Sequence, residues 1–174
     1  VEHTHFNDPE KREHIRRLLI RAAQQKTIPI VNYNDPVSDE ENRKMELAIR
    51  RSHGDQVVEC VDNDETAAVI ANLVHAKKLV LMTSTEGIYR DPTDPKTLVE
   101  QVTAKSMEEL EEKLRQLQES CVGASRAGAN GAKAKLEYAL KSARQGTMVI
   151  IGHARHRLSD LVEGRVACTR IGLE

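Results

Sequence analysis

The segment Lys78-Leu-Val-Leu-Met-Thr83 decides the fold class of this chain. Its unbroken apolar run has the length of a strand, and such runs are typical of strands buried in parallel sheets. A second run, Thr147–Ile151, follows a segment with helical periodicity. Because strand-like and helix-like segments alternate along the chain, we predict an α/β fold with a mostly parallel sheet and helices on both faces.

The other elements are marked by caps and by apolar spacing. Asn7 or Asp8 can cap a helix that has Pro9 at its first position, and Ser106 can cap another. Gly146 can end a helix. We expect further helices over Ser38–Ser52, Thr66–His75, Met107–Cys121, Lys135–Arg144 and Leu158–Val162, and further strands over Thr27–Asn32, Gln56–Val61, Leu98–Val102 and Ala167–Ile171.

Composition excludes several classes of function. The net charge is −1, which gives no overall attraction to nucleic acid or to anionic membranes. The chain has one Phe and no Trp, so it offers few stacking surfaces for single-stranded nucleic acid. We therefore reject a nucleic-acid contact through Arg126, Lys133, Lys135 and Lys141.

The cysteines and histidines indicate neither a disulfide framework nor a metal site. Cys60, Cys121 and Cys168 are odd in number and far apart, which is typical of free thiols. The pairs His3/His5 and His153/His156 have no Cys or carboxylate at ligand spacing nearby, so we interpret them as surface histidines.

The length of 174 residues suits one domain, and we predict a single domain over 1–174. The apolar runs are too short to cross a bilayer. Val1 is not an initiator Met, and no signal peptide is readable from it. We expect the chain to begin at an internal cut.

Ligands of open α/β sheets bind beyond the carboxyl ends of the strands. This rule selects three polar loops, Asn32–Ser38, Thr83–Tyr89 and Gly152–Arg157. A fourth segment, Gly123–Leu136, is rich in Gly and Ala and runs through Lys133 and Lys135 into a helix. Small residues allow a close approach of backbone N–H groups to a phosphate, and lysines supply positive charge. The segment is not a Walker loop, and a solvated surface turn is the alternative interpretation.

Two pairs of Asn and Asp lie near these loops, Asn34-Asp35 and Asn63-Asp64. An amide beside a carboxylate suits a zwitterionic ligand, although turns and helix caps use the same residues. Together with the lysine segment, the pairs suggest phosphoryl transfer to a small molecule, which requires positioning and charge neutralisation.

These motifs resemble those of the amino-acid kinase family, and within it those of the glutamate 5-kinase branch. The resemblance rests on four segments in the family's order and spacing: Ile28–Asp35, Val61–Asp64, Leu79–Pro92 and Gly128–Lys135. It implies a three-layer α/β/α sandwich, ATP with Mg²⁺ bound through the nucleotide, and phosphorylation of the γ-carboxylate of glutamate in proline biosynthesis. It also implies a cytoplasmic homo-oligomer.

The resemblance further implies roles for single residues. Catalysis would fall to Lys135, Asp64 and Asp62, and the substrate would be bound by Asn34, Asp35 and Asn63. The nucleotide would be bound by Thr83, Ser84, Gly87, Tyr89, Asn130, Gly131, Lys133 and Lys135, and no protein metal site is implied.

The chain departs from the family pattern in several places. Thr83-Ser84 replaces Thr-Asp, and Asn130-Gly131-Ala132 replaces Gly-Gly-Met. The family's N-terminal half, with its phosphate-binding lysine, is not in this sequence. We therefore expect a fragment, or a second chain that carries the rest, with little or no catalysis by this chain alone. The alternatives are a non-catalytic regulatory domain, or a kinase for aspartate, acetylglutamate or a phosphonate.

Overall fold

The computed structural model describes residues 1, 3–32, 63–91, 93–120 and 131–174. These residues fall into two compact units, Val1–Thr66 and Ala67–Glu174, which are described one at a time. The prediction of a single domain over 1–174 stays a prediction. The helix expected over Ser38–Ser52 and the strand expected over Gln56–Val61 lie outside the described residues.

The first unit contains helices α1 (His3–Asn7) and α2 (Pro9–Gln24). The predicted cap of α2 is confirmed, and Asp8 supplies it: its Oδ1 accepts hydrogen bonds from the backbone N–H groups of Glu10 at 2.9 Å and Lys11 at 3.1 Å. Pro9 takes the first helical position, where its missing N–H has no cost.

The prediction of a strand over Thr27–Asn32 is wrong. None of the described strands pairs with this segment, which has no regular secondary structure. The side chains of Ile28 and Ile30 are 90% and 95% exposed. β-Branched residues favour an extended backbone, but a strand also needs a neighbour for its N–H and C=O groups, and Pro29 offers no N–H.

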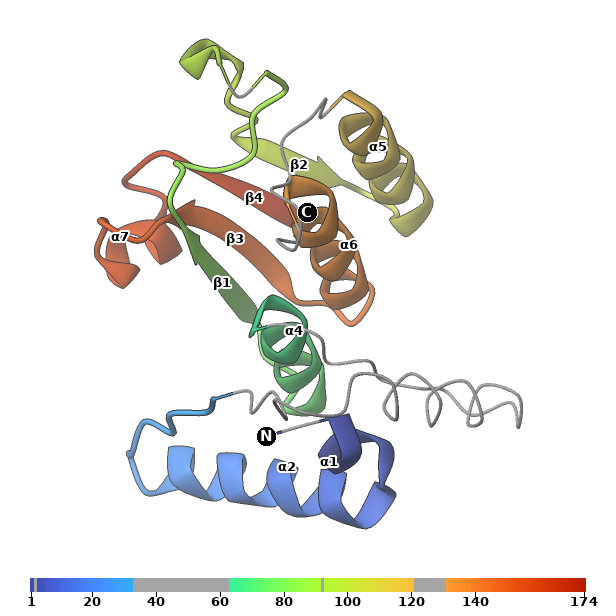
Figure 1. Ribbon diagram of the computed structural model, residues 1–174, viewed down its shortest axis with the longest axis vertical. Helices are drawn as coiled ribbons and strands as arrows, with labels where there is room; N and C mark the ends of the chain where they lie inside the picture. Colours follow the sequence, from blue (N-terminus) through green and yellow to red (C-terminus); the bar gives the residue numbers. More distant parts are fainter. Residues whose placement is uncertain (2, 33–62, 92, 121–130) are drawn as a thin grey trace, which may run out of the picture. The chain divides into compact units, whose positions relative to one another are not determined.

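The second unit is built on a four-stranded sheet with the order β1-β3-β4-β2 (Figure 1). The strands are β1 (Lys78–Thr83), β2 (Gln101–Ala104), β3 (Met148–His153) and β4 (Cys168–Leu173). β1 is parallel to β3, and β2 is parallel to β4, whereas β3 and β4 are antiparallel. The predicted α/β fold with a mostly parallel sheet is confirmed, with one antiparallel pair at its centre.

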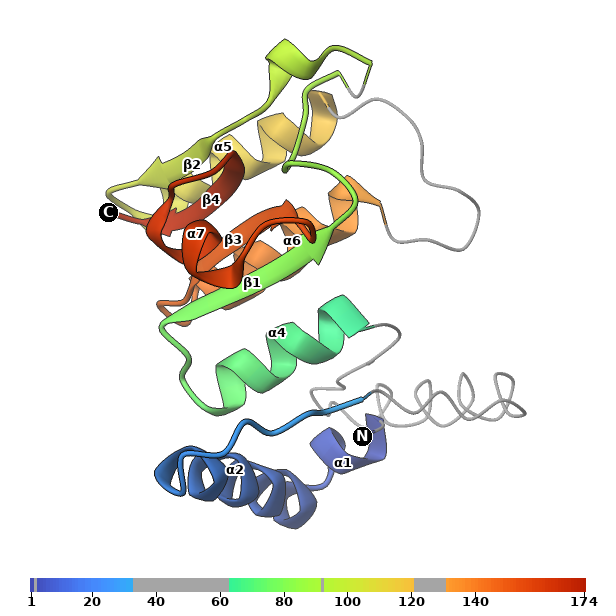
Figure 2. The ribbon, with the colours of Figure 1, turned by 90° about the vertical axis from the view of Figure 1, so that its left-hand side faces the viewer.

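Helices cover both faces of this sheet (Figures 1 and 2). α5 (Met107–Ser120) and α6 (Ala132–Ala143) lie on one face, and the short α7 (Leu158–Glu163) lies on the other. α4 (Asn63–Leu73) adds Ala68 and Ala71 to the core. The core on the first face is aliphatic and includes Leu110, Leu114, Leu136, Val149, Ile151 and Ile171. A smaller cluster under α7 contains Ile150, Leu161 and Cys168.

The burial of β1 differs from the continuous burial that its apolar run predicts. Leu79 and Leu81 are buried in the main core, whereas Met82 on the other face is 45% exposed. The reason is the position of the strand: β1 is an edge of the described sheet, and α7 is too short to cover the whole of the second face.

Several element boundaries also differ from the prediction. α4 begins at Asn63 rather than Thr66. β2 begins at Gln101 rather than Leu98, because Leu98 pairs instead with Tyr89 in an isolated bridge. α6 begins at Ala132 rather than Lys135, so that Lys133 and Lys135 both lie in its first turn and not in a loop.

Candidate functional site

The candidate site is built at the carboxyl ends of β1 and β3. Thr83 and His153 end these parallel strands in register, and the N–H of Ala154 donates to the Thr83 carbonyl at 2.8 Å. α6 leads into the start of β3, so its N-terminus lies toward the same edge of the sheet (Figure 1). Chain topology therefore brings the loops after β1 and β3 and the first turn of α6 to one end of the sheet, where α/β proteins bind ligands.

The loop after β1 is anchored by the hydroxyl of Thr169 in β4. Its Oγ1 accepts a hydrogen bond from the N–H of Ile88 at 2.8 Å and donates to the carbonyl of Val99 at 2.6 Å. Gly87 lies against the same residue: a Cβ at this position would overlap Thr169 Oγ1 and lie 2.9 Å from its backbone nitrogen. The glycine is therefore required by packing, independently of any ligand.

A side-chain cluster joins the loop after β1 to the loop after β3. The half-buried carboxylate of Glu86 contacts the Arg155 guanidinium through Oε1 and the Nε2 of His156 through Oε2, at 2.6 Å for the latter. The backbone N–H of Arg155 donates a hydrogen bond to the Nδ1 of His153 at 3.0 Å, so this ring nitrogen is the acceptor. The Glu86 carboxylate thus contacts two residues that lie 69 and 70 positions after it in the sequence.

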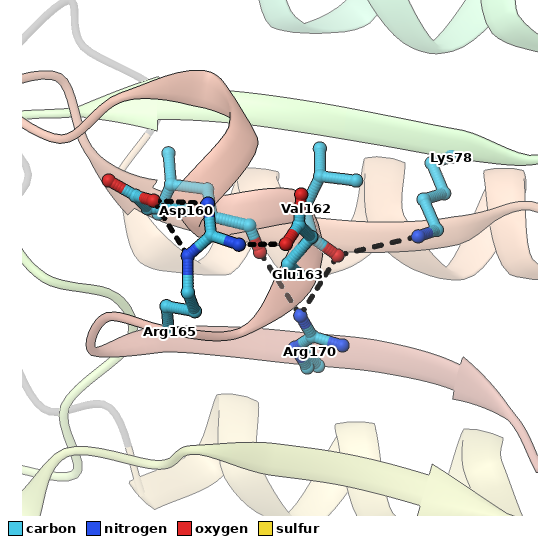
Figure 3. A network of polar contacts seen from close by, with 7 residues as sticks. Lys78, Asp160, Val162, Glu163, Arg165 and Arg170 are labelled. Atoms are coloured by element: carbon cyan, nitrogen blue, oxygen red, sulfur yellow. Dashed lines mark hydrogen bonds and ion pairs between the residues drawn. The ribbon is translucent and has the colours of Figure 1, made fainter.

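The other end of the loop after β3 is held by α7 and its capping network (Figure 3). The Arg170 guanidinium donates to the carbonyls of Leu161 at 3.1 Å and Val162 at 3.2 Å. These are carbonyls at the end of the helix, where cations are favourable. Arg165 pairs with Asp160 at 2.6 Å, as well as with Glu163. α7 is therefore fixed to the sheet, and the loop that precedes it is held at both ends.

The first turn of α6 supplies backbone donors and two lysines. Gly131 is the N-cap residue, and no side chain of the described residues caps the helix. Lys133 is exposed and Lys135 is half-buried. Residues two apart do not share a helix face, so the two lysines serve different surfaces. Unsatisfied N–H groups and the positive end of the helix dipole favour an anion at such a terminus.

Comparison with known proteins identifies the family. The model of the amino acid kinase family matches residues 2–153. The chain belongs to the amino acid kinase family. Among relatives in this family, the chain is 31% identical over 173 residues to a glutamate 5-kinase of Geobacillus kaustophilus, a match that covers 96% of this chain and 41% of that protein. The chain thus spans less than half the length of this relative.

Solved structures agree with the fold of an amino acid kinase. A carbamate kinase from Giardia lamblia bound to AMP-PNP matches with a TM-score of 0.50 and 18% identity, over 65% of this chain and 32% of that one. A protein from Aeropyrum pernix K1 matches with a TM-score of 0.53 and 17% identity, over 91% of this chain and 45% of that one. At these identities the likeness shows the fold alone.

The structure brings together part of the site expected for an amino acid kinase. Thr83, Ser84, Gly87 and Tyr89 lie at the end of β1 or in the loop that follows, and Gly131, Lys133 and Lys135 begin α6. Asn63 and Asp64 lie in the first turn of α4, in the first unit. Asn34, Asp35, Asp62 and Asn130 lie outside the described residues. The roles expected for all of these residues stay predictions.

Sequence reasoning missed Glu86, Arg155 and His156. The sequence predicts a surface histidine at position 156, but the side chain of His156 is only 20% exposed and contacts Glu86. No local pattern connects an acidic residue in one loop with a basic residue in another. The available signal was positional: both loops follow strands that were expected to be parallel, so their side chains were candidates for contact.

Among the described residues, no group of three or more His, Cys, Asp or Glu side chains is placed to hold a metal ion. None of the helices described here is long and apolar enough to cross a membrane.

Proposed function

We propose that this chain forms the nucleotide-binding part of a kinase that transfers the γ-phosphoryl group of ATP to the γ-carboxylate of glutamate. The observation that carries the proposal is the arrangement at the carboxyl ends of β1 and β3, with Lys133 and Lys135 in the first turn of α6. The likeness to a glutamate 5-kinase across 96% of the chain supports glutamate as the acceptor.

The residues present suit the phosphates of a nucleotide. A lysine is a common ligand of a phosphate, and uncapped N–H groups at a helix start favour an anion. Phosphoryl transfer proceeds mainly by positioning and by neutralising charge on the transferred group. In this proposal the acceptor carboxylate attacks the γ-phosphorus in line, ADP leaves, and Lys135 stabilises the charge on the transferred oxygens.

The proposal assigns Mg²⁺ to the nucleotide rather than to a protein cage. Mg²⁺ in phosphoryl-transfer sites is usually held by substrate phosphates with one or two carboxylates, and it supplies charge neutralisation there. The residues present fit this arrangement, because the described residues in the loops after β1 and β3 and in the first turn of α6 are mainly cationic or neutral. Proline synthesis, a cytoplasmic location and a homo-oligomer belong to the same proposal.

Isothermal titration of the chain with MgATP tests the proposal. We expect saturable binding that weakens about tenfold or more in Lys135→Ala, since a hydrogen bond to a charged group contributes about 1.5–3 kcal/mol. The matched control is Lys141→Ala, which removes the same charge from the last turn of α6, where Lys141 pairs with Glu137 at 3.0 Å. The control should bind as the unchanged chain does.

Three outcomes would count against the proposal. An absence of MgATP binding by a folded chain would favour a non-catalytic regulatory domain. Equal losses in Lys135→Ala and Lys141→Ala would indicate a general electrostatic effect rather than a site at the start of α6. In the enzyme that contains the remaining part, phosphorylation of aspartate or acetylglutamate in preference to glutamate would overturn the proposed acceptor.

A further inference from the structure

We propose that Arg155 binds the phosphates of the nucleotide and that Glu86 is the residue that positions it. The inference rests on the proposed function and adds a second source of positive charge to it. Arg155 lies two residues after the end of β3, and its neighbour Ala154 is hydrogen-bonded to the end of β1. The guanidinium therefore originates at the carboxyl edge of the two parallel strands, beside the loop that begins at Ser84.

Glu86 limits the freedom of the Arg155 side chain. A long side chain on a surface loses conformational entropy when it binds a ligand, and a prior contact removes part of that cost. The Glu86 side chain is only 17% exposed and is also held by His156 at 2.6 Å, so it provides a fixed anchor. The backbone of Arg155 is held in turn by the Nδ1 of His153 at 3.0 Å.

Arg155 keeps donors for a ligand despite this contact. Its hydrogen bond to Glu86 uses Nη2, and within the described residues Nε and Nη1 make no hydrogen bond. The side chain is 63% exposed. A guanidinium has five N–H donors in a planar fork that matches two phosphate oxygens at once, so one edge can bind the carboxylate while another binds an anion.

The local charge also favours an anion. The residues 153–157 include two arginines and two histidines, and the Glu86 carboxylate contacts Arg155 and His156 among them. One carboxylate cannot neutralise both Arg155 and Arg157. The net charge of this group of side chains is therefore positive, which favours binding of a negatively charged triphosphate.

The test measures the affinity of variants for ATP, ADP and adenosine by titration calorimetry. In Arg155→Ala we expect affinity for ATP and ADP to fall about tenfold, with adenosine affinity unchanged, because only the phosphates are contacted. Arg155→Lys should recover part of the loss. Glu86→Ala should weaken ATP binding by a smaller factor, and Glu86→Ala combined with Arg155→Ala should be no weaker than Arg155→Ala alone, since Glu86 acts through Arg155.

Matched controls separate this effect from charge and from folding. Arg157→Ala removes an exposed arginine two positions away, and it should lower ATP affinity by a clearly smaller factor than Arg155→Ala, because it removes nearby charge but no phosphate contact. Glu163→Ala breaks a different carboxylate–arginine pair, with Arg165, and should leave affinity unchanged. Thermal unfolding of each variant shows whether it is folded.

The outcomes distinguish this inference from the proposed function. If the unchanged chain binds MgATP and Arg155→Ala binds it equally well, the inference is overturned and the function stands. Equal losses for adenosine and ATP would overturn the phosphate contact. If the unchanged chain binds no MgATP, the proposed function fails, and tripolyphosphate becomes the probe: binding that is lost in Arg155→Ala supports an anion site, and no binding overturns it.

Discussion

At the scale of single residues, the loop after β1 depends on the contact between Gly87 and Thr169. A methyl group at position 87 would overlap Thr169 Oγ1, which already binds Ile88 and Val99. The hydroxyl cannot move away without breaking two hydrogen bonds. A small residue in the candidate nucleotide loop is thus explained by packing, whatever the loop binds.

We predict that Gly87→Ala lowers the free energy of unfolding by about 1–3 kcal/mol, the usual cost of overpacking a buried position. Denaturant titration measures this change. Ser84→Ala, at an exposed position in the same loop, should stay within about 0.5 kcal/mol of the unchanged chain. If Gly87→Ala and the unchanged chain are equally stable, the loop can accommodate a methyl group at position 87, and the packing argument is wrong.

A second prediction at this scale concerns the acidity of Glu13 in α2. Hydrogen bonds from Arg16 at 2.7 Å and from Arg17 at 3.0 Å lower the pKa of the Glu13 carboxyl from 4.5 to about 2. A lowered pKa means that the pair stabilises the folded state above pH 4.5 and that this contribution is lost as the pH falls through about 2. NMR titration of the Glu13 side-chain carbonyl measures the pKa directly.

In Arg16→Gln the pKa of Glu13 should rise toward its ordinary value without reaching it, because Arg17 remains. Arg21→Gln is the matched control: it removes the same charge about two turns from Glu13 along α2 and should leave the pKa of Glu13 low. A Glu13 that titrates near 4.5 in the unchanged chain would mean that solvent breaks the pairs.

At the scale of elements, helix caps decide where the helices begin. The N–H of Glu109 donates to Ser106 Oγ at 3.2 Å, and the Glu109 carboxylate accepts from the N–H of Lys105 at 3.3 Å. The arrangement is close to a capping box, in which a hydroxyl and an acidic residue three positions later satisfy N–H groups at the helix start. It fixes the start of α5, whose Leu110 and Leu114 enter the core.

We predict that Ser106→Ala lowers the free energy of unfolding by about 1 kcal/mol, through loss of the cap. Ser106→Asp should retain most of the stability, because its carboxylate can accept the same bond. Circular dichroism during denaturant titration measures both variants. A larger loss in Ser106→Asp than in Ser106→Ala would show that Ser106 is not acting as a cap.

Local patterns predicted these elements well, since caps and apolar spacing act within one or two turns. Asp8, Ser106 and the apolar run at Leu79–Met82 gave α2, α5 and β1 at close to their observed bounds. The errors have tertiary causes. The segment Thr27–Asn32 has strand-forming residues but no neighbouring strand among the described residues, and Leu98 pairs with Tyr89 instead of extending β2.

At the scale of the whole molecule, the sheet places residues from distant parts of the sequence at one edge. Thr83 and His153 are neighbours because β1 and β3 are parallel and in register. The same pairing sets the distance between Glu86 and the residues after β3. The candidate site is therefore a property of the sheet topology rather than of any one motif.

We predict that the chain alone, supplied with glutamate and MgATP, forms little or no γ-glutamyl phosphate. The chain spans 41% of the length of a glutamate 5-kinase that it matches, and transfer requires both the nucleotide and the acceptor to be positioned. Trapping with hydroxylamine measures the product as a hydroxamate. A rate as high as that of a complete glutamate 5-kinase in the same assay would overturn the prediction. The same reaction mixture without glutamate serves as the blank.

The sequence by itself determined the fold class, the starts of several helices, and the motifs that are similar to those of amino acid kinases. These follow from local rules: apolar periodicity, caps and small-residue loops act over a few residues. Tertiary structure alone decided the central antiparallel pair, the exposure of Met82, and the contact of Glu86 with Arg155 and His156. The physical reason is that these features depend on which strands become neighbours, and that choice is made by the core as a whole.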